Sequence, residues 1–261
     1  MPQVSEQKAT RQGSIPVLDH GYVRLIETWG RGDAGEAEAG IVEAARQSTQ
    51  GSFRGWDKDE KLLRFLYTAR PPHATPFEFA GMVVEVQAPI AVFREWHRHR
   101  VQSFEETVWG IDNLDDTGYN EMSARYAPLP DLNYVPTVER CLAVSATNKQ
   151  AGAVTGSEPI TKGSASEWLV ELAMAYDDCE KVYQSGLNRG VPKELARMVL
   201  PVGRYSRMRA STNLRNWLAF LTLRMDPAAQ WEIRQYAEAL GSIIAREFPR
   251  TWKLFEEGRS N

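Results

Sequence analysis

The segment Phe77–Val86 constrains the fold of this chain more than any other. Met82, Val84 and Val86 lie on one side of a strand at this place, and Val83 makes the other side apolar as well. A strand with two apolar sides is typical of a sheet that is covered on both faces. The pattern therefore predicts a central sheet packed between other elements.

Length and composition indicate a folded protein with few domains. At roughly 150 residues per domain, 261 residues correspond to between one and two domains. Apolar residues make up 43% of the chain and charged residues 25%, which excludes a disordered, collagen-like or coiled-coil protein. Residues 1–15 are polar and without periodicity, so we expect a flexible arm there, followed by a single domain over residues 16–261.

The overall charge and the two cysteines limit the partners and the compartment. A net charge of −3 and a pI of about 5.9 give no general attraction to nucleic acid or to an anionic membrane. Cys141 and Cys179 cannot build a disulfide framework, so we expect reduced thiols in a cytoplasmic protein. The chain contains no apolar run long enough for a signal peptide or a membrane span.

Capping signals and periodicity predict helices before and after the strand. One helix is expected from about Ala34 to Arg46, with Asp33 as its N-cap and Glu36 completing a capping box. A second helix is expected to follow Asp57.

Two longer helices are predicted in the C-terminal half. The last one is expected to begin near Pro227, with Asp226 as its N-cap, and to stop before Pro249. Before it, a long helix is expected over about Glu167–Leu187. Its apolar residues recur at spacings of three and four and predict one buried stripe: Leu169, Leu172, Tyr176, Cys179 and Tyr183.

Two segments depart from this regular pattern. Residues 105–119 contain five acidic residues and no basic one, and residues 143–166 are rich in Gly, Ser, Thr and Ala. We expect the second segment to be a flexible excursion. Both are treated as insertions in the domain.

Basic residues gather between Arg189 and Arg224, where eight of them accompany a single acid, Glu194. In an acidic protein such a segment indicates an anion site, and arginine favours bidentate contact with phosphate or carboxylate. A solvated basic face is the alternative. Neutral hydrogen-bonding groups among the arginines, at Ser211, Asn213 and Asn216, favour the site.

A second basic cluster, Arg98-His99-Arg100, follows a helix that we expect to start near Pro89. Metal binding by His97 and His99 is disfavoured, because the chain has four histidines and no HExxH or CxxC. RNA binding is disfavoured by the net charge. An anion site held by the two arginines, and an exposed helix end whose dipole favours cations, both stay open at this point.

The same residues carry a resemblance to a known family. Arg98-His99-Arg100, Ser103 and Asn120–Tyr126 are similar to the signature of the flavin-dependent thymidylate synthases once the fifteen residues 105–119 are removed. Three further blocks agree in order over about residues 20–250: Ala44–Ser48, His73–Glu78, and the C-terminal series Ala196–Pro201, Thr212–Arg215, Phe220–Arg224 and Ala229–Arg234.

This resemblance implies a fold, an assembly and a reaction. The fold would be α/β, with a central sheet flanked by long helices in a single catalytic domain, and the assembly a homotetramer with sites at subunit interfaces. The cofactors would be FAD, NADPH and methylenetetrahydrofolate. The reaction would methylate uracil C5 of a nucleotide monophosphate. Neither Cys141 nor Cys179 resembles an activated nucleophile, and a flavin mechanism does not need one. A non-catalytic nucleotide- or RNA-binding module is the alternative.

The resemblance also implies roles for single residues. Arg224 would face the uracil carbonyl edge, Arg98 would touch both ligands, and Glu121 would position the nucleotide or the flavin; Arg224, Arg98 and His99 form the expected catalytic set. The nucleotide phosphate would be held by Ser123, Ala124, Arg125 and Arg197. The flavin or its diphosphate would be held by Ser48, His73, Thr75, Arg98, His99, Arg100, Asn213 and Arg215.

Three departures from the family pattern bear on the substrate. The acidic insertion lies inside the signature, Phe79 and Ala219 replace a histidine and an asparagine that are common there, and Glu95 stands where glutamine is usual. An ionised Glu95 near a ribose could accept hydrogen bonds from hydroxyls. Related methylases of nucleoside-antibiotic pathways act on UMP, so UMP stays open beside dUMP as the substrate. The insertion is either part of the ribose pocket or a tolerated surface loop.

Overall fold

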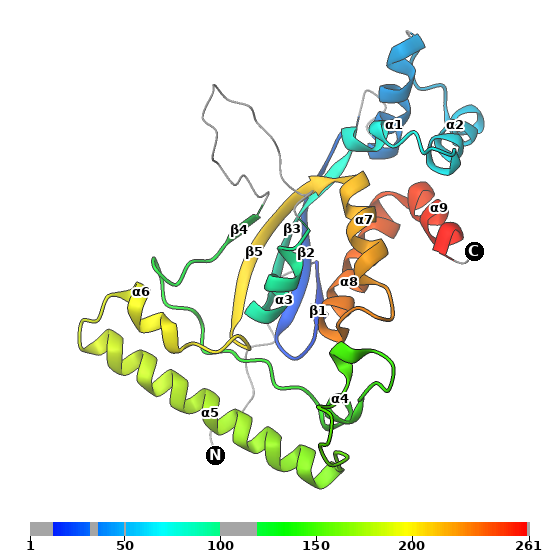
Figure 1. The fold of residues 1–261 in the computed structure, drawn as a ribbon. Coiled ribbons are helices and arrows are strands. Elements are labelled where there is room, and N and C mark those ends of the chain that lie inside the picture. Colours follow the sequence, from blue (N-terminus) through cyan, green and yellow to red (C-terminus); the bar gives the residue numbers. More distant parts are fainter. Residues whose placement is uncertain (1–12, 32–35, 50, 100–118, 260–261) are drawn as a thin grey trace.

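A five-stranded antiparallel sheet forms the centre of the molecule (Figure 1). The computed structural model describes residues 13–31, 36–49, 51–99 and 119–259. The strand order is β1-β2-β3-β5-β4, which places β3 in the middle. The strands are β1 Ser14–Val17, β2 Gly21–Trp29, β3 Gly81–Pro89, β4 Tyr119–Glu121 and β5 Tyr205–Asn213.

Helices pack on one face of this sheet and at its ends, and together with the sheet they give the mixed α/β architecture that was predicted. The α-helices are α1 Ala37–Arg46, α2 Trp56–Thr68, α3 Ile90–Trp96, α4 Val138–Leu142, α5 Lys162–Asn188, α6 Lys193–Ala196, α7 Leu214–Arg224, α8 Trp231–Glu247 and α9 Pro249–Arg259. Short 3-10 turns are η1 Gln47–Thr49, η2 Thr75–Phe79, η4 Lys149–Ala151 and η5 Arg197–Val199. None of the helices in the described ranges combines the length and the apolar run that crossing a membrane requires.

The predicted central strand is confirmed, with a later start. The chain forms the turn η2 over Thr75–Phe79, and β3 begins at Gly81. Met82, Val84 and Val86 are fully buried in the core that β3 forms with α3 and α7, as the alternation predicts. The ring of Phe77 also enters the core, from η2.

The second face of the sheet is more polar than the strand pattern predicts. Glu85 of β3 is paired across the sheet with Arg24 of β2 and Arg209 of β5. The Glu85 carboxylate accepts hydrogen bonds from the Tyr22 hydroxyl at 2.8 Å and from Arg24 at 3.3 Å. An antiparallel sheet commonly has one face on the core and one polar face, and this sheet follows that rule.

The first and last helices differ from their predicted bounds. Helix α1 begins at Ala37, and Glu36 caps it without a side-chain hydrogen bond, because the Glu36 carboxylate accepts from the Trp56 indole at 2.7 Å instead. The predicted capping box is therefore wrong at Glu36, and its other member, Asp33, lies outside the described residues.

The C-terminal prediction is wrong at the start of α8 and confirmed at its end, because α8 stops at Glu247, before Pro249, although another helix follows it. Asp226 accepts a hydrogen bond from the Ala228 amide and closes a turn, so the helix starts only at Trp231. Pro249 ends α8 but also begins α9, because the first turn of a helix tolerates the missing amide of proline.

Helix α5 is longer than predicted and lies along one end of the molecule, away from α7 to α9 (Figure 1). Thr161 and Ser164 form a reciprocal capping box, so the helix starts inside the segment that was expected to be a flexible excursion. Of the predicted stripe only Tyr183 is fully buried, and the other four residues are half-buried. The outer face carries exposed apolar side chains: Trp168, Val170, Met174 and Val182.

Candidate active site

Arg224, the last residue of α7, is held by three contacts with the end of α3. Its Nε donates a 2.6 Å hydrogen bond to Nε2 of His99, and its Nη2 donates to the backbone oxygen of Glu95 at 2.8 Å. The Glu95 carboxylate lies 3.5 Å from Nη1. Helices α3 and α7 thus bring together three of the residues that the sequence analysis assigned to the site.

His99 is buried beside Arg224. Its ring lies 4.8 Å from the Phe220 ring, and its backbone amide donates to the Trp96 oxygen. Burial, and then the nearby Arg224 cation, lower the pKa of His99 to about 4. The imidazole is therefore neutral at pH 7. Because Nε2 accepts the bond from Arg224, the geometry assigns the ring proton to Nδ1.

The Glu95 carboxylate also pairs with Arg98, at 3.6 Å. Burial lowers the pKa of Arg224, and Arg98 lowers it further, whereas Glu95 raises it. Glu95 thus offsets the repulsion between two cations that lie on either side of it. The Arg98 side chain is 73% exposed, so its guanidinium is accessible to a ligand, while Arg224 is only 16% exposed.

Strand β4 places the second part of the signature next to this cluster. The Tyr119 hydroxyl donates to the backbone oxygen of His99 at 3.1 Å, and Glu121 lies opposite Met208 of β5. Tyr119 was predicted to be the last residue of the acidic insertion, but it is the first residue of β4. The sequence analysis missed Tyr119 because its partner His99 lies on the other side of the acidic segment in the chain.

Arg125 and Lys193 contact the turn at Ser123. The Ser123 hydroxyl accepts hydrogen bonds from the Arg125 amide at 3.3 Å and from its Nε at 3.1 Å. The Lys193 ammonium donates to the backbone oxygen of Tyr126 at 3.0 Å. Arg197 follows Lys193 by four residues, so the two side chains share one face of the helical segment α6–η5. Ala124 is buried at the centre of the turn.

Lys193 was not among the predicted site residues. The sequence analysis counted it only as part of the basic segment. The signal that identifies it is its spacing from Arg197, because residues four apart on a helix are neighbours.

The remaining flavin candidates lie at the opposite end of α7. Asn213 caps this helix, where its Oδ1 accepts from the Asn216 amide at 2.9 Å, and Arg215 forms an ion pair with Glu78 of η2. His73 stacks on Phe65 with ring centroids 5.2 Å apart, and Thr75 is the first residue of η2. Ser48 lies in η1, and its hydroxyl donates to the Ala45 oxygen.

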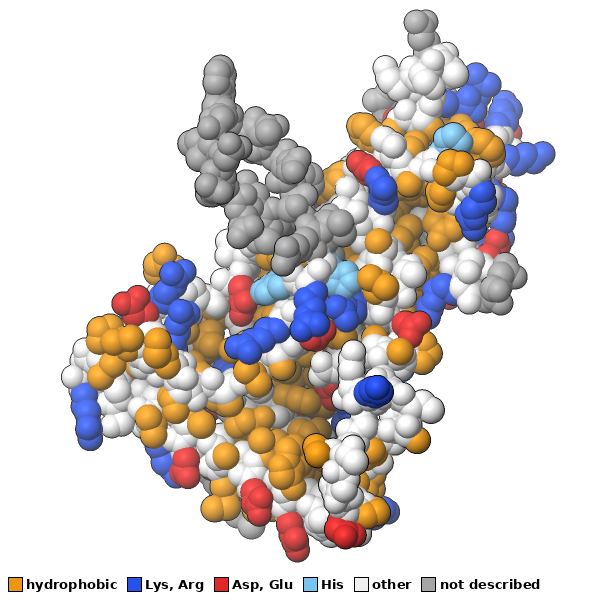
Figure 2. All heavy atoms as spheres, viewed as in Figure 1, with side chains coloured by type: hydrophobic (Ala, Val, Ile, Leu, Met, Phe, Trp, Pro, Cys, Tyr) orange, Lys and Arg blue, Asp and Glu red, His pale blue; other side chains and the backbone are white. Residues whose placement is uncertain are grey.

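A single chain therefore divides the predicted residues between the two ends of α7. This helix has 11 residues, which separates Asn213 and Arg215 from Arg224 by about 15 Å. In the space-filling view, basic side chains lie beside histidine side chains near the middle of the molecule, and another histidine lies far from them at the end formed by α1, α2 and η2 (Figure 2). Arg100 lies outside the described residues.

The exposed donors suit a flavin dinucleotide. Arg98 and Arg215 carry accessible guanidinium groups, and Thr75 and Asn213 add a hydroxyl and an amide. Arginine and neutral N–H or O–H donors are the groups that bind a diphosphate. The residues present therefore fit FAD, provided that both ends of α7 can contribute.

A metal centre has no support in the described part of the chain. No group of three or more His, Cys, Asp or Glu side chains there is placed to hold an ion. His99 is bonded to Arg224, and Nε2 of His97 lies 3.4 Å from the Met208 sulfur.

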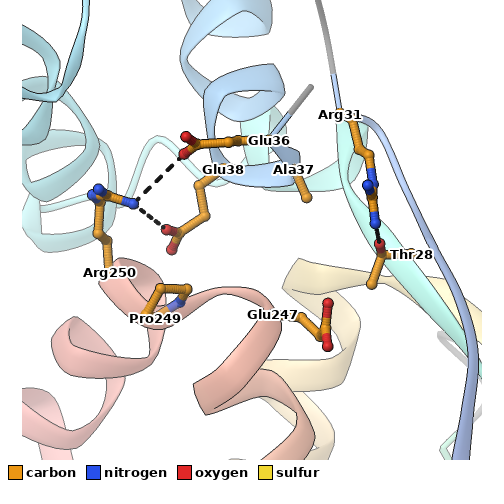
Figure 3. A pocket seen from close by; sticks show the side chains of 8 residues that line it. All are labelled: Thr28, Arg31, Glu36, Ala37, Glu38, Glu247, Pro249 and Arg250. Carbon is orange, nitrogen blue, oxygen red and sulfur yellow. Dashed lines mark hydrogen bonds and ion pairs between the residues drawn. The ribbon is translucent and has the colours of Figure 1, made fainter. Parts of the chain in front are cut away.

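A cavity of about 210 Å³ lies elsewhere, between α1, the end of β2 and the junction of α8 and α9 (Figure 3). Arg250 pairs there with Glu36 and Glu38. The cavity contains none of the predicted site residues; its lining consists of Thr28, Arg31, Glu36, Ala37, Glu38, Glu247, Pro249 and Arg250.

Known proteins are similar to this chain in sequence and in fold. The family model "Thymidylate synthase complementing protein" (Thy1) matches residues 24–250. A flavin-dependent thymidylate synthase of Thermus thermophilus is 37% identical over 246 residues, which cover 94% of this chain and 78% of that protein. The enzyme of the same name from Thermotoga neapolitana is 33% identical over 241 residues, which cover 92% of this chain and 93% of that protein.

Solved structures of a related enzyme superpose on the same fold. The UMP/dUMP methylase PolB from Streptomyces cacaoi bound with 5-Br UMP matches with a TM-score of 0.71 and 29% identity, over 93% of this chain and 96% of that chain. The same enzyme bound with 5-Br dUMP matches with a TM-score of 0.72 and 28% identity, over 93% and 97% of the two chains.

Proposed function

The chain belongs to the flavin-dependent thymidylate synthase family, and from this membership we propose that it methylates C5 of the uracil ring in both UMP and dUMP. The observation that supports this best is the fixed Arg224 guanidinium, whose partner His99 contacts β4, the strand that leads to the signature turn at Ser123. Methylenetetrahydrofolate is the proposed carbon donor and NADPH the proposed reductant. FAD, when bound, supplies the hydride that completes the methyl group.

Arg224 is the proposed catalytic cation. Methylation at C5 requires negative charge to develop on the uracil ring and its carbonyl oxygens. A guanidinium that is already fixed in position stabilises such charge without reorganising during the reaction. The contacts of Arg224 with His99 and Glu95 provide this fixed position.

The turn at Ser123 is the proposed phosphate site. Arg125 and Arg197 supply charged donors, and the hydroxyl of Ser123 supplies a neutral one. Lys193 adds a third cation, because its ammonium already contacts the same turn. Glu121, at the end of β4, lies between this turn and the His99 cluster and is proposed to orient the nucleotide.

The state of the cysteines supports flavin rather than thiolate chemistry. Both Cys141 and Cys179 are free and half-buried. Burial raises the pKa of the Cys141 thiol, which disfavours the thiolate that a nucleophile needs. Two free thiols also fit the proposed cytoplasmic location.

A homotetramer with sites at subunit interfaces would bring the two ends of α7 together. Within one chain they lie about 15 Å apart, and the resemblance assigns residues at both ends to the same flavin. The apolar outer face of α5 supports assembly, since Trp168, Met174 and Val182 are exposed in the single chain. Figure 2 shows hydrophobic side chains over α5 and α6.

The choice of sugar is proposed to be permissive. PolB, which has the same fold, has been crystallised with both a ribonucleotide and a deoxyribonucleotide. The sequence prediction that Glu95 contacts a ribose hydroxyl stays a prediction, because its carboxylate already lies near two arginines.

Turnover with defined substrates tests this function. Purified protein should be yellow, should bleach with NADPH under anaerobic conditions, and should convert UMP and dUMP to C5-methylated products when isotopically labelled methylenetetrahydrofolate is added. Mass spectrometry of the nucleotide shows whether the labelled carbon has been transferred. A colourless protein that binds UMP but cannot be reconstituted with FAD would instead support the non-catalytic binding module.

A further inference from the structure

We propose that Asp59, a fully buried aspartate on α2, is a positioning residue for the flavin. Together with Arg46 it fixes the connection between α1 and α2, which carries Ser48, and holds this connection on the helix that leads to His73. The proposal rests on the proposed function, in which Ser48 and His73 bind FAD. The Asp59 side chain is itself inaccessible to a ligand, so its role is to place residues that are accessible.

Both carboxylate oxygens of Asp59 are used to close the connection between α1 and α2, which lie next to each other at one end of the molecule (Figure 1). Oδ1 pairs with Nη2 of Arg46, the last residue of α1. Oδ2 accepts a 2.6 Å hydrogen bond from the backbone amide of Arg54, close to the start of α2. Hydrogen bonds to an ionised group are about twice as strong as those between neutral groups. One side chain in the first turn of α2 therefore holds the two ends of the connection together.

The turn that carries Ser48 is attached to the same arginine. The backbone oxygen of Arg46 accepts hydrogen bonds from the Thr49 hydroxyl at 3.0 Å and from the Gly51 amide at 3.2 Å. Ser48 is exposed on this turn, so it is accessible to a ligand. Its position depends on Arg46 and, through Arg46, on Asp59.

Helix α2 also fixes the second flavin candidate. The His73 amide donates to the backbone oxygen of Leu66 at 3.1 Å, and the His73 ring stacks on the Phe65 ring with centroids 5.2 Å apart. Leu66 is buried in the core, which anchors this part of the helix. Asp59, at the start of the same helix, thereby gives Ser48 and His73 a common rigid support.

The ionisation of Asp59 favours positioning over a gain in stability. Burial raises the pKa of Asp59, but the hydrogen bonds from Arg46 and from the Arg54 amide more than offset this effect, so the pKa lies below its usual value. The carboxylate is therefore charged at pH 7. A buried ion pair is often no more stabilising than apolar residues of the same volume, because both charges lose their hydration. Stability alone does not explain such a pair, whereas two directed bonds from one carboxylate fix the geometry of the connection.

Asp59→Asn tests the proposal. Asparagine has nearly the same shape, but it has one acceptor oxygen and no charge, so it cannot keep both contacts. We expect the Kd of FAD, measured by reconstitution of the apoprotein, to rise about 10-fold, the lower end of the effect that loss of a supporting contact has at metal sites. The Kd of UMP at saturating FAD should change by less than about 3-fold, as for a substitution away from the site.

Glu232→Gln is the matched control, because Glu232 forms a comparable ion pair between two other helices. Its carboxylate is 8% exposed and accepts from Nε and Nη2 of Arg140 at 2.8 and 3.3 Å, which joins α4 to α8. We expect this variant to lose stability as Asp59→Asn does, but to bind FAD with the Kd of the wild type. An unchanged Kd of FAD in Asp59→Asn, or an equal rise in Glu232→Gln, would overturn the proposal.

Arg46→Lys tests the same pair with a smaller perturbation of the fold. Lysine keeps the cation but presents a single ammonium in place of a planar guanidinium. The Kd of FAD should rise by at least about 3-fold, the scale of one weakened hydrogen bond. An Arg46→Lys protein that binds FAD as tightly as the wild type would contradict the role of the pair.

Hydrogen exchange in the apoprotein measures the positioning without flavin. Amides of residues 51–55 should exchange at least about 10-fold faster in Asp59→Asn than in the wild type, while those of β3 should be unchanged. Equal exchange of residues 51–55 in the two proteins would show that Asp59 does not fix the connection. A wild type that binds FAD but does not methylate UMP would instead contradict the proposed function and leave the role of Asp59 supported by the FAD measurements.

Discussion

Nε of Arg224 donates a 2.6 Å hydrogen bond to Nε2 of His99, a residue 125 positions earlier in the chain. The bond joins the end of α7 to the end of α3, and it links the family's Arg-His-Arg signature directly to the arginine that is proposed to face the uracil ring. It also requires a neutral histidine, because a protonated imidazole has no acceptor. Protonation of His99 would therefore remove a contact on which both the stability of the fold and the position of Arg224 depend.

The first prediction concerns stability against pH. The pKa of His99 is lowered from 6.5 to about 4 in the folded chain. Between these values the unfolded chain binds a proton that the folded chain does not, so the free energy of unfolding must fall as the pH falls from 6.5 to 4. The full contribution, about 3 kcal/mol as an order of magnitude, is present above pH 6.5 and lost progressively to pH 4.

Urea unfolding at several pH values measures this effect. The comparison is the wild type against His99→Gln, which lacks the titrating ring while other groups are unchanged. As the pH is lowered from 7 to 4, the unfolding free energy of the wild type should fall relative to that of His99→Gln. A difference that stays constant over this range would show that His99 titrates normally.

The second prediction separates the two ligands. Arg125→Ala and Arg197→Ala should each raise the Kd of UMP about 10- to 100-fold, since each removes a charged hydrogen bond to phosphate. Lys193→Gln should have a smaller effect in the same direction, because the ammonium already donates to the Tyr126 oxygen. Flavin content, read from the visible absorption, should stay near that of the wild type.

Uridine, which lacks the phosphate, is the matched ligand, and its affinity should not change in any of these variants. Arg189→Ala, an exposed residue of the same basic segment, should bind UMP normally. Equal loss of UMP and uridine would show a general disruption of the site.

The third prediction concerns the acidic segment. Residues 105–118 can be deleted while Tyr119 is kept, because the hydroxyl of Tyr119 contacts His99. If the segment shapes the ribose pocket, the ratio of kcat/KM for UMP to kcat/KM for dUMP should change by at least about 10-fold, the scale of a lost contact to a hydroxyl. A passive surface loop would leave that ratio as it is in the intact enzyme.

How far the sequence predicts this molecule depends on the range of the interaction concerned. The alternation at Met82, Val84 and Val86 predicts a buried strand because it is local. The predicted start of α8 is wrong because the Asp226 side chain accepts a hydrogen bond within a turn and does not cap the helix. An aspartate side chain can do either, so the sequence alone does not distinguish the two. The contact between His99 and Arg224 depends on packing between distant helices, and no spacing in the chain predicts it.

The sequence also does not show that the expected site residues lie at two ends of α7. The family blocks predict which residues bind flavin, but they give no information about which of those residues come from the same subunit. Asn213 and Arg224 belong to adjacent blocks in the sequence and yet lie at opposite ends of α7. Only the length of the helix shows that these two groups of expected site residues lie about 15 Å apart within one chain.

The fourth prediction tests the assembly. Val182→Glu on the apolar outer face of α5 should lower the native mass measured by light scattering and reduce flavin content at the same time, because a charge is buried without a partner if that face is an interface. Lys61→Glu, which introduces the same acid on the exposed surface of α2, should leave both unchanged. Dissociation with full flavin content would place the flavin site within one chain.

The fifth prediction concerns the attachment of α5 to the sheet. The Arg204 side chain, just before β5, is fully buried and pairs with Asp131 at 2.8 Å and with Glu180 of α5. Arg204→Met should lower the free energy of unfolding by about 3–5 kcal/mol, because it leaves the largely buried Glu180 carboxylate without its cation. Asp131 is 57% exposed, so water can solvate its carboxylate when Arg204 is replaced.

Two further variants identify the cause of that loss. Arg204→Met combined with Glu180→Met should recover much of the stability, since replacing both members of a buried ion pair is far less costly than removing one. Arg94→Met, at an exposed position, should change the unfolding free energy by no more than about 0.5 kcal/mol. If the double variant is as unstable as Arg204→Met alone, the loss comes from packing around residue 204 and not from the unpaired carboxylate.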